Sequence, residues 1–105
     1  MEIIYLARVV EFVDSLNPQE RSKIRKSREL LKKYGNLLGM PVSRSLGDSL
    51  FELRILGNTH VRLFYCFYND CVYVLHGVIK KTNAINEKDL KHAKELKDRF
   101  HSDNI

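Results

Sequence analysis

Two arginines lie on segments that resemble neighbouring strands, and their spacing would set their guanidinium groups side by side. Residues 50–56, 60–68 and 71–80 are rich in β-branched and aromatic residues, which predicts three strands. With a three-residue turn between the first two, Arg54 stands directly opposite Arg62. Such like charges destabilise a sheet unless Glu52 separates them or an anion lies between them. Guanidinium forks suit phosphate, so we predict an anion site here, with solvated or Glu52-paired arginines as the alternative.

The same register sorts the other side chains onto two faces, because alternate residues of a strand point to opposite sides. One face collects apolar residues and would be the core, and it includes His76 as a buried, hydrogen-bonded residue or, alternatively, a catalytic one. The opposite face carries the two arginines together with Glu52, Phe64, Tyr68, Tyr73 and Lys81. Its three rings would either stack on bases or be covered by the C-terminal helix. Lys81 would stand at the open end of this face.

Helices precede these strands in the sequence. Residues 2–6 predict a short first strand, and apolar residues then recur with a helical period over residues 9–16. A second helix should begin at the capping sequence "NPQE" of residues 17–20 and end at Gly35. Its exposed faces are mostly basic, which indicates either a solvated surface or a surface for phosphates or an acidic partner.

The order of elements after the second helix completes the fold prediction. Residues 36–49 contain three small or rigid residues and no clear period, so we expect a loop. Asn86 should cap a last helix whose apolar side ends at Phe100. The resulting order β-α-α-β-β-β-α predicts one α+β domain over residues 1–105, an antiparallel sheet with two N-terminal helices on one face and a C-terminal helix.

Composition narrows the functional class. The chain has 105 residues and a formal net charge of +5, which permits a polyanionic partner. No apolar run is long enough to span a bilayer and no export signal is evident, so we expect a cytoplasmic protein without a membrane partner. Cys66 and Cys71 are too few for a disulfide framework or a zinc site, and no pair of histidines has a convincing metal spacing.

Three segments in order, "SLFELRI", "HVRLFY" and "VLHGVIKKT", followed by a basic helix, resemble the RelE/ParE toxin superfamily and most closely its HigB-like, phage-derived branch. The resemblance covers nearly the whole chain and implies the RelE-like fold. It also implies the toxin of a type II toxin–antitoxin pair, an endoribonuclease that needs no metal or cofactor. Such toxins cut mRNA on the ribosome and thereby inhibit translation.

The resemblance also assigns roles to individual positions. Arg62 matches the strand arginine that contacts the scissile phosphate, and Arg54 matches a basic residue of the catalytic strand. Lys80 and Lys81 match the basic end of the last strand, with Lys81 favoured by the strand alternation. No obvious general acid or base matches the pattern of the relatives, and Glu52 and His60 are the candidate substitutes. The alternatives are that Glu52 orients an arginine and that His60 is a solvated residue at a strand start. We include Glu52 in the expected catalytic set. The expected RNA contacts are Lys80, Phe64, Tyr68, Tyr73, Arg25 and Arg28.

The sequence departs from the pattern of these relatives after the lysines. Residues 83–86 read "NAIN" where many relatives continue with lysine and proline, and no tyrosine follows Tyr73. The alternatives are therefore a ParE-like poison of DNA gyrase and a weakened homologue that only binds an antitoxin. In each case we expect a cognate antitoxin, often a helix-turn-helix protein. For the ribonuclease, mRNA and the ribosome are further partners.

Overall fold

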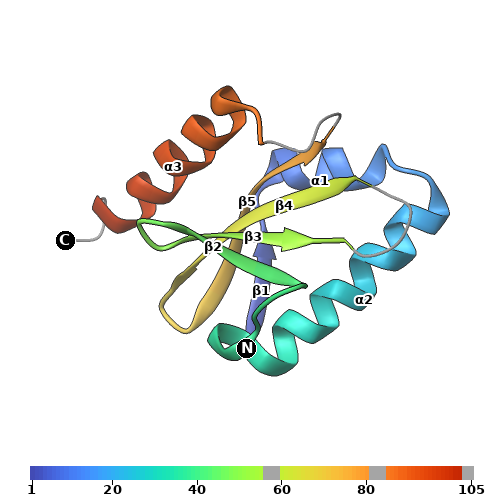
Figure 1. The fold of residues 1–105 in the computed structure, drawn as a ribbon, viewed down its shortest axis with the longest axis horizontal. Helices are drawn as coiled ribbons and strands as arrows, with labels where there is room; N and C mark the ends of the chain where they lie inside the picture. Colours follow the sequence, from blue (N-terminus) through green and yellow to red (C-terminus); the bar gives the residue numbers. More distant parts are fainter. Residues whose placement is uncertain (56–59, 81–84, 103–105) are drawn as a thin grey trace.

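The computed structural model describes residues 1–55, 60–80 and 85–102 and is built on one five-stranded sheet (Figure 1). The strand order is β1-β5-β4-β3-β2. The strands are β1 (Glu2–Tyr5), β2 (Ser43–Gly47), β3 (Leu50–Arg54), β4 (Val61–Tyr68) and β5 (Cys71–Ile79). The helices are α1 (Ala7–Asp14), α2 (Pro18–Tyr34), the short 3-10 helix η1 (Gly35–Leu37) and α3 (Glu87–Ser102).

The α+β prediction is confirmed, with two corrections to the sheet. β1 runs parallel to β5, so the sheet is mixed and the fully antiparallel expectation was wrong. The segment 36–49 is not a loop throughout, because β2 pairs antiparallel with β3. A bulge between Ser45 and Gly47 interrupts this short pairing. Because the bulge breaks the alternation of side chains, the sequence does not indicate a strand here.

The start of α2 follows the predicted capping sequence. The Asn17 side chain accepts a hydrogen bond from the backbone N–H of Glu20 at 2.8 Å, and the Glu20 carboxylate accepts one from the backbone N–H of Asn17 at 3.2 Å. These two bonds satisfy N–H groups that a helix start would otherwise leave unpaired. The helix ends where Gly35 takes a φ of 55°, a conformation that favours glycine.

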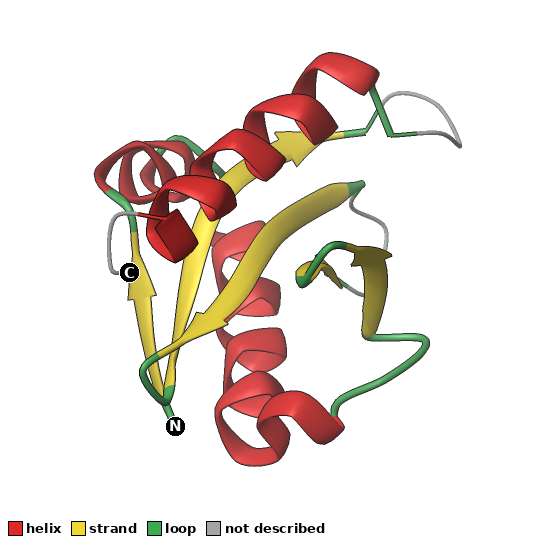
Figure 2. Ribbon diagram, turned by 90° about the vertical axis from the view of Figure 1, so that its left-hand side faces the viewer, coloured by secondary structure: helices red, strands yellow, loops and turns green. Residues whose placement is uncertain are grey.

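The helices cover both faces of the sheet, with α2 and α3 on opposite sides (Figure 2). The core between the sheet and the N-terminal helices contains Val9 of α1, Ile24 and Leu31 of α2 and Leu63 of β4. A second, smaller core lies under α3. It contains Leu50, Phe64, Cys66, Leu75 and Ala93. The face that would carry the predicted anion site is therefore partly covered by α3.

The predicted pairing of β3 with β4 is confirmed, since Arg54 lies directly opposite Arg62. The pairing of β4 with β5 starts as predicted, with Tyr65 opposite Val74, but then shifts so that Phe64 lies opposite His76. The extra residue, Leu75, forms a bulge that reverses the alternation of everything after it.

The bulge overturns the predicted position of His76. His76 lies on the α3 side of the sheet rather than in the core beneath α1 and α2, and Val78 moves with it. The physical gain is burial, because Leu75 is only 2% exposed in the core under α3. Gly77 now faces α1, and a Cβ there would lie 2.5 Å from Cδ2 of Phe12. The glycine thus allows α1 to pack closely against β5.

Candidate functional site

Three arginines surround one buried carboxylate on the α3 side of the sheet. Glu52, in the middle of β3, is fully buried, and its Oε1 lies 3.2 Å from Nε of Arg54. Nε of Arg44 and Nε of Arg62 each lie 3.9 Å from the same oxygen. We call Arg44, Arg54 and Arg62, with Glu52 at their centre, the arginine cluster. It brings together three residues that the sequence analysis predicted and one that it missed.

Strand geometry alone places these side chains on one face. Arg54 follows Glu52 by two residues on β3, Arg62 lies opposite Arg54, and Arg44 of β2 lies opposite Glu52. Arg44 was missed because β2 was predicted as a loop. The signal that could have found it is the dipeptide Gly47-Asp48 before β3, which is typical of a hairpin turn.

The cluster carries excess positive charge, since one carboxylate faces three guanidinium groups. Burial lowers the pKa of Arg62; the Glu52 carboxylate opposes this change, whereas Arg54 and Arg44 add to it. The side chain of Arg44 is 43% exposed and that of Arg54 27% exposed, so solvent reaches the cluster. An anion that entered would relieve the repulsion among the arginines.

Two buried atoms of the cluster lack hydrogen bonds. Within the described residues, Oε2 of Glu52 and Nε of Arg62 have no hydrogen-bond partner. Nη1 of Arg62 donates to the backbone carbonyl of Val61 at 3.0 Å, so the guanidinium is only partly satisfied. Buried polar groups without partners are rare and costly in folded proteins. Both atoms lie within the arginine cluster, beside its three guanidinium groups.

Lys80 takes the place that was predicted for Lys81. The bulge at Leu75 puts Lys80 on the side of β5 that Val78 and His76 occupy. Lys81, for which this place was predicted, lies outside the described residues. Burial lowers the pKa of Lys80, and the positive charge of Arg62 lowers it further, as do Arg54 and Arg44, against the influence of Glu52. Lys80 thus lies within electrostatic reach of the whole cluster.

The predicted stacking role of Phe64 was wrong. Its ring is fully buried under α3 and stacks on His76 at a centroid distance of 5.9 Å, so no base could reach it. Tyr73 is half-buried and packs on Phe100 of α3 at 4.4 Å, and Tyr68 contacts the same ring at 6.2 Å. For all three rings the structure shows the alternative, coverage by the C-terminal helix.

Arg25 and Arg28, the predicted RNA contacts of α2, are separated from the arginine cluster by the sheet. α2 packs on the opposite face, through Ile24 and Leu31. Arg25 is exposed, whereas Arg28 pairs with Glu29 at 3.8 Å. The two arginines therefore belong to a different surface of the molecule.

The two histidines that were considered for catalysis occupy different environments. His60 is exposed at the start of β4, and its backbone carbonyl accepts a hydrogen bond from the N–H of Lys80 at 2.8 Å. His76 is partly buried, and its Nε2 lies 2.9 Å from Oδ1 of Asp89 on α3. His60 is thus beside Lys80 in the sheet, whereas His76 is tied to α3.

Residues 1–55, 60–80 and 85–102 contain no group of three or more histidine, cysteine or acidic side chains placed to hold a metal ion. Within the same ranges, no helix combines the length and apolar character needed to cross a bilayer.

The sequence matches the pattern of one protein family but no individual curated protein. The sequence pattern of the family described as "Phage derived protein Gp49-like (DUF891)" matches residues 11–98. This match includes every residue of the arginine cluster, the whole of α2 and α3 as far as Asp98. The chain belongs to the phage-derived Gp49-like family, which is a RelE/toxin-like family.

Proposed function

We propose that the chain is the toxin of a type II toxin–antitoxin pair and that it cleaves mRNA on the ribosome without a metal ion. The arginine cluster carries this proposal, because three guanidinium groups converge on one solvent-accessible site. Planar donor forks of this kind match the geometry of phosphate oxygens as well as that of carboxylates. Membership of the Gp49-like family supports the toxin class, and the HigB-like resemblance supports RNA as the substrate.

The chemistry would use the RNA's own nucleophile. The 2′-oxygen attacks the adjacent phosphorus, and the bond from phosphorus to the 5′-oxygen breaks. The products are a 2′,3′-cyclic phosphate and a 5′-hydroxyl. The protein must align these atoms and neutralise the charge that grows on the phosphate. It must also remove the proton of the 2′-hydroxyl and supply a proton to the leaving 5′-oxygen.

Each member of the site has a role in this proposal. Arg62 and Arg54 hold the phosphate and stabilise its developing charge, and Arg44 extends their reach toward the neighbouring strand. Glu52 acts as a positioning residue, since it is fully buried and touches all three guanidinium groups. Lys80 is the group to which we assign proton transfer, because its lowered pKa brings the exchange of its proton nearer to neutral pH.

The decisive experiment compares Arg62→Ala with Arg25→Ala, a matched arginine on the opposite face. Removal of one preorganised donor to a developing negative charge costs about 10² to 10³ in rate, so Arg62→Ala should slow cleavage by that factor. Arg25→Ala should retain full activity. Growth arrest, mapping of transcript 5′ ends on isolated ribosomes and circular dichroism of both purified variants provide the readouts.

The chemistry has its own control in the substrate. A 2′-deoxynucleotide at the cleavage position removes the attacking oxygen and should abolish cleavage while binding persists. Growth arrest with intact transcripts would reject the ribonuclease. A DNA-damage response in such cells would instead identify a poison of DNA gyrase. Absence of any growth effect, together with tight binding of an antitoxin, would identify an inactive binding homologue.

A further inference from the structure

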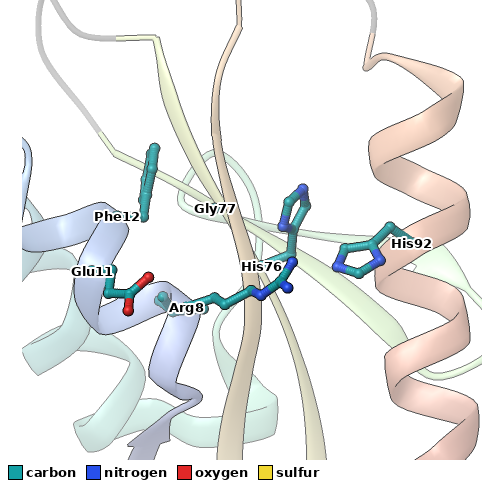
Figure 3. A pocket seen from close by; sticks show the side chains of 7 residues that line it. Arg8, Glu11, Phe12, His76, Gly77 and His92 are labelled. Atoms are coloured by element: carbon teal, nitrogen blue, oxygen red, sulfur yellow. The ribbon is translucent and has the colours of Figure 1, made fainter.

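A polar pocket lies between α1, β5 and the beginning of α3 (Figure 3). Its volume is about 560 Å³. It is lined by Arg8, Val9, Glu11, Phe12, His76, Gly77 and His92. A neighbouring hollow of about 420 Å³ shares Arg8, His76 and His92 with it and adds Arg99. None of the three arginines of the arginine cluster lines either hollow, so this pocket is a separate feature.

The pocket exists because β1 is shorter than β5. β1 pairs only with residues 71–74, and the chain leaves the sheet after Leu6, whose N–H donates to the carbonyl of Val74 at 3.1 Å. β5 continues to Ile79, and beyond Val74 none of the described strands pairs with its outer edge. Gly77, which also lines the pocket, lets the ring of Phe12 pack close to the strand at this edge. Solvent and small ligands can therefore reach this edge.

His76 is held in a fixed orientation at the base of this pocket. Its Nε2 lies 2.9 Å from Oδ1 of Asp89, and its ring stacks on the buried ring of Phe64. The ring of His92 meets it edge-on at a centroid distance of 4.9 Å. Asp89 engages only one nitrogen of His76. Packing and hydrogen bonding from two elements thus preorganise a pair of imidazoles, as a binding site requires.

Arg8 reaches across β5 toward these two rings. Figure 3 shows its guanidinium directed to His76 and His92, whereas the carboxylate of Glu11 lies near the base of the Arg8 side chain. Within the described part of the chain, Arg8 forms no ion pair with a carboxylate. A guanidinium and two imidazoles from three different elements therefore converge, and the Asp89 carboxylate is already engaged by His76.

We propose that this pocket binds a phosphate group, with Arg8 and His92 as direct ligands and His76, fixed by Asp89, completing the site. Arg8 supplies a planar pair of donors, and the imidazoles supply N–H donors that gain charge when protonated. The phosphate belongs either to an RNA backbone that continues past the arginine cluster or to a small phosphorylated molecule. The proposal does not depend on RNA cleavage, since no residue of the arginine cluster takes part.

The test is a titration of the full-length protein with inorganic phosphate, followed by NMR of the imidazole nitrogens. Saturable shifts at His76 and His92 are expected. Arg8→Gln should weaken the affinity by about tenfold or more, because it removes the pair of charge-assisted hydrogen bonds that Arg8 donates. Arg8→Lys keeps the positive charge but lacks the planar pair of donors, so its affinity for phosphate should lie between those of the wild-type and Arg8→Gln proteins. Arg25→Gln, at an exposed site on α2, is the matched control and should bind phosphate normally.

Two further arms identify the source of the phosphate. In an Arg62→Ala background, a 2′-deoxy-blocked RNA that displaces phosphate from His92 indicates an RNA backbone. Displacement by adenosine monophosphate but not by RNA indicates a small molecule, and either result supports the site. Absence of saturable shifts at both histidines would overturn the proposal, and so would equal affinity in the wild-type and Arg8→Gln proteins. Failure of RNA cleavage in the other assays would leave this result unaffected.

Discussion

Glu52→Gln is the substitution that tests the arginine cluster most directly, because it keeps the shape of the side chain and removes its charge. Near a protein surface, where the effective dielectric constant is about 20, unit charges at 3.2 Å attract by about 5 kcal/mol and those at 3.9 Å by about 4 kcal/mol. These attractions offset the burial of the carboxylate, which costs several kcal/mol, and the repulsion among three guanidinium groups.

The loss of stability caused by Glu52→Gln should be large but smaller than the sum of the three attractions. The side chains of Arg54 and Arg62 remain 27% and 16% exposed, so water screens part of the loss. We expect Glu52→Gln to lower the free energy of unfolding by about 3 kcal/mol, the lower end of the range for breaking buried ion pairs. A small domain has about 5–15 kcal/mol in total, so the melting temperature should fall by more than about 10 °C.

Urea denaturation at pH 7 measures this change as a lower midpoint with an unchanged slope. Glu29→Gln is the matched control, since Glu29 is 64% exposed and pairs with Arg28 at 3.8 Å, and it should change stability by less than about 0.5 kcal/mol. Removing a cation as well, in Glu52→Gln/Arg54→Gln, should restore part of the loss. If Glu52→Gln and Glu29→Gln were equally stable, the reasoning would be refuted. Such a result would mean that solvent alone offsets the repulsion among the three arginines.

Three further predictions concern the packing around the site. Gly77→Ala should destabilise the protein by about 1–3 kcal/mol, because its Cβ would lie 2.5 Å from the ring of Phe12. Gly39→Ala, where the Cβ would enter open space, is the control, and urea denaturation measures the stability of both variants. Cys66 should resist a thiol reagent at pH 8 until the protein unfolds, because burial raises its pKa to about 11 and keeps it protonated; rapid modification of native protein would contradict this. Tyr65→Phe should cost about 1–3 kcal/mol in thermal unfolding by removing the buried hydrogen bond to the Ser43 hydroxyl, and adding Ser43→Ala should recover part of it.

Features that depend on neighbours in the sequence were predictable. The capping box of Asn17 and Glu20 is local, and so is the stop at Gly35. The opposition of Arg54 and Arg62 followed from alternation along two strands whose apolar residues must share one face. These features need no knowledge of the rest of the fold, which explains why two of the three arginines of the cluster were found.

Features that depend on tertiary packing were not predictable in this way. No local signal marks Leu75 as a bulged residue, since its position is stabilised by the core under α3. The burial of Phe64 has the same cause, because only the placement of α3 decides that this face of the sheet is covered there. Alternation alone predicted an open surface at both points.

The bulge also shows how one residue can change the assignment of chemistry in a sheet. Without it, His76 would lie in the core and Lys81 would lie beside the arginines. With it, His76 meets Asp89 and His92 under α3, and Lys80 comes within reach of Arg62. Two separate groups of basic side chains therefore result. One is the arginine cluster around the buried carboxylate of Glu52, and the other lines the pocket at the open edge of β5. The overall charge of +5 is compatible with many functions, but this placement favours phosphate as the ligand.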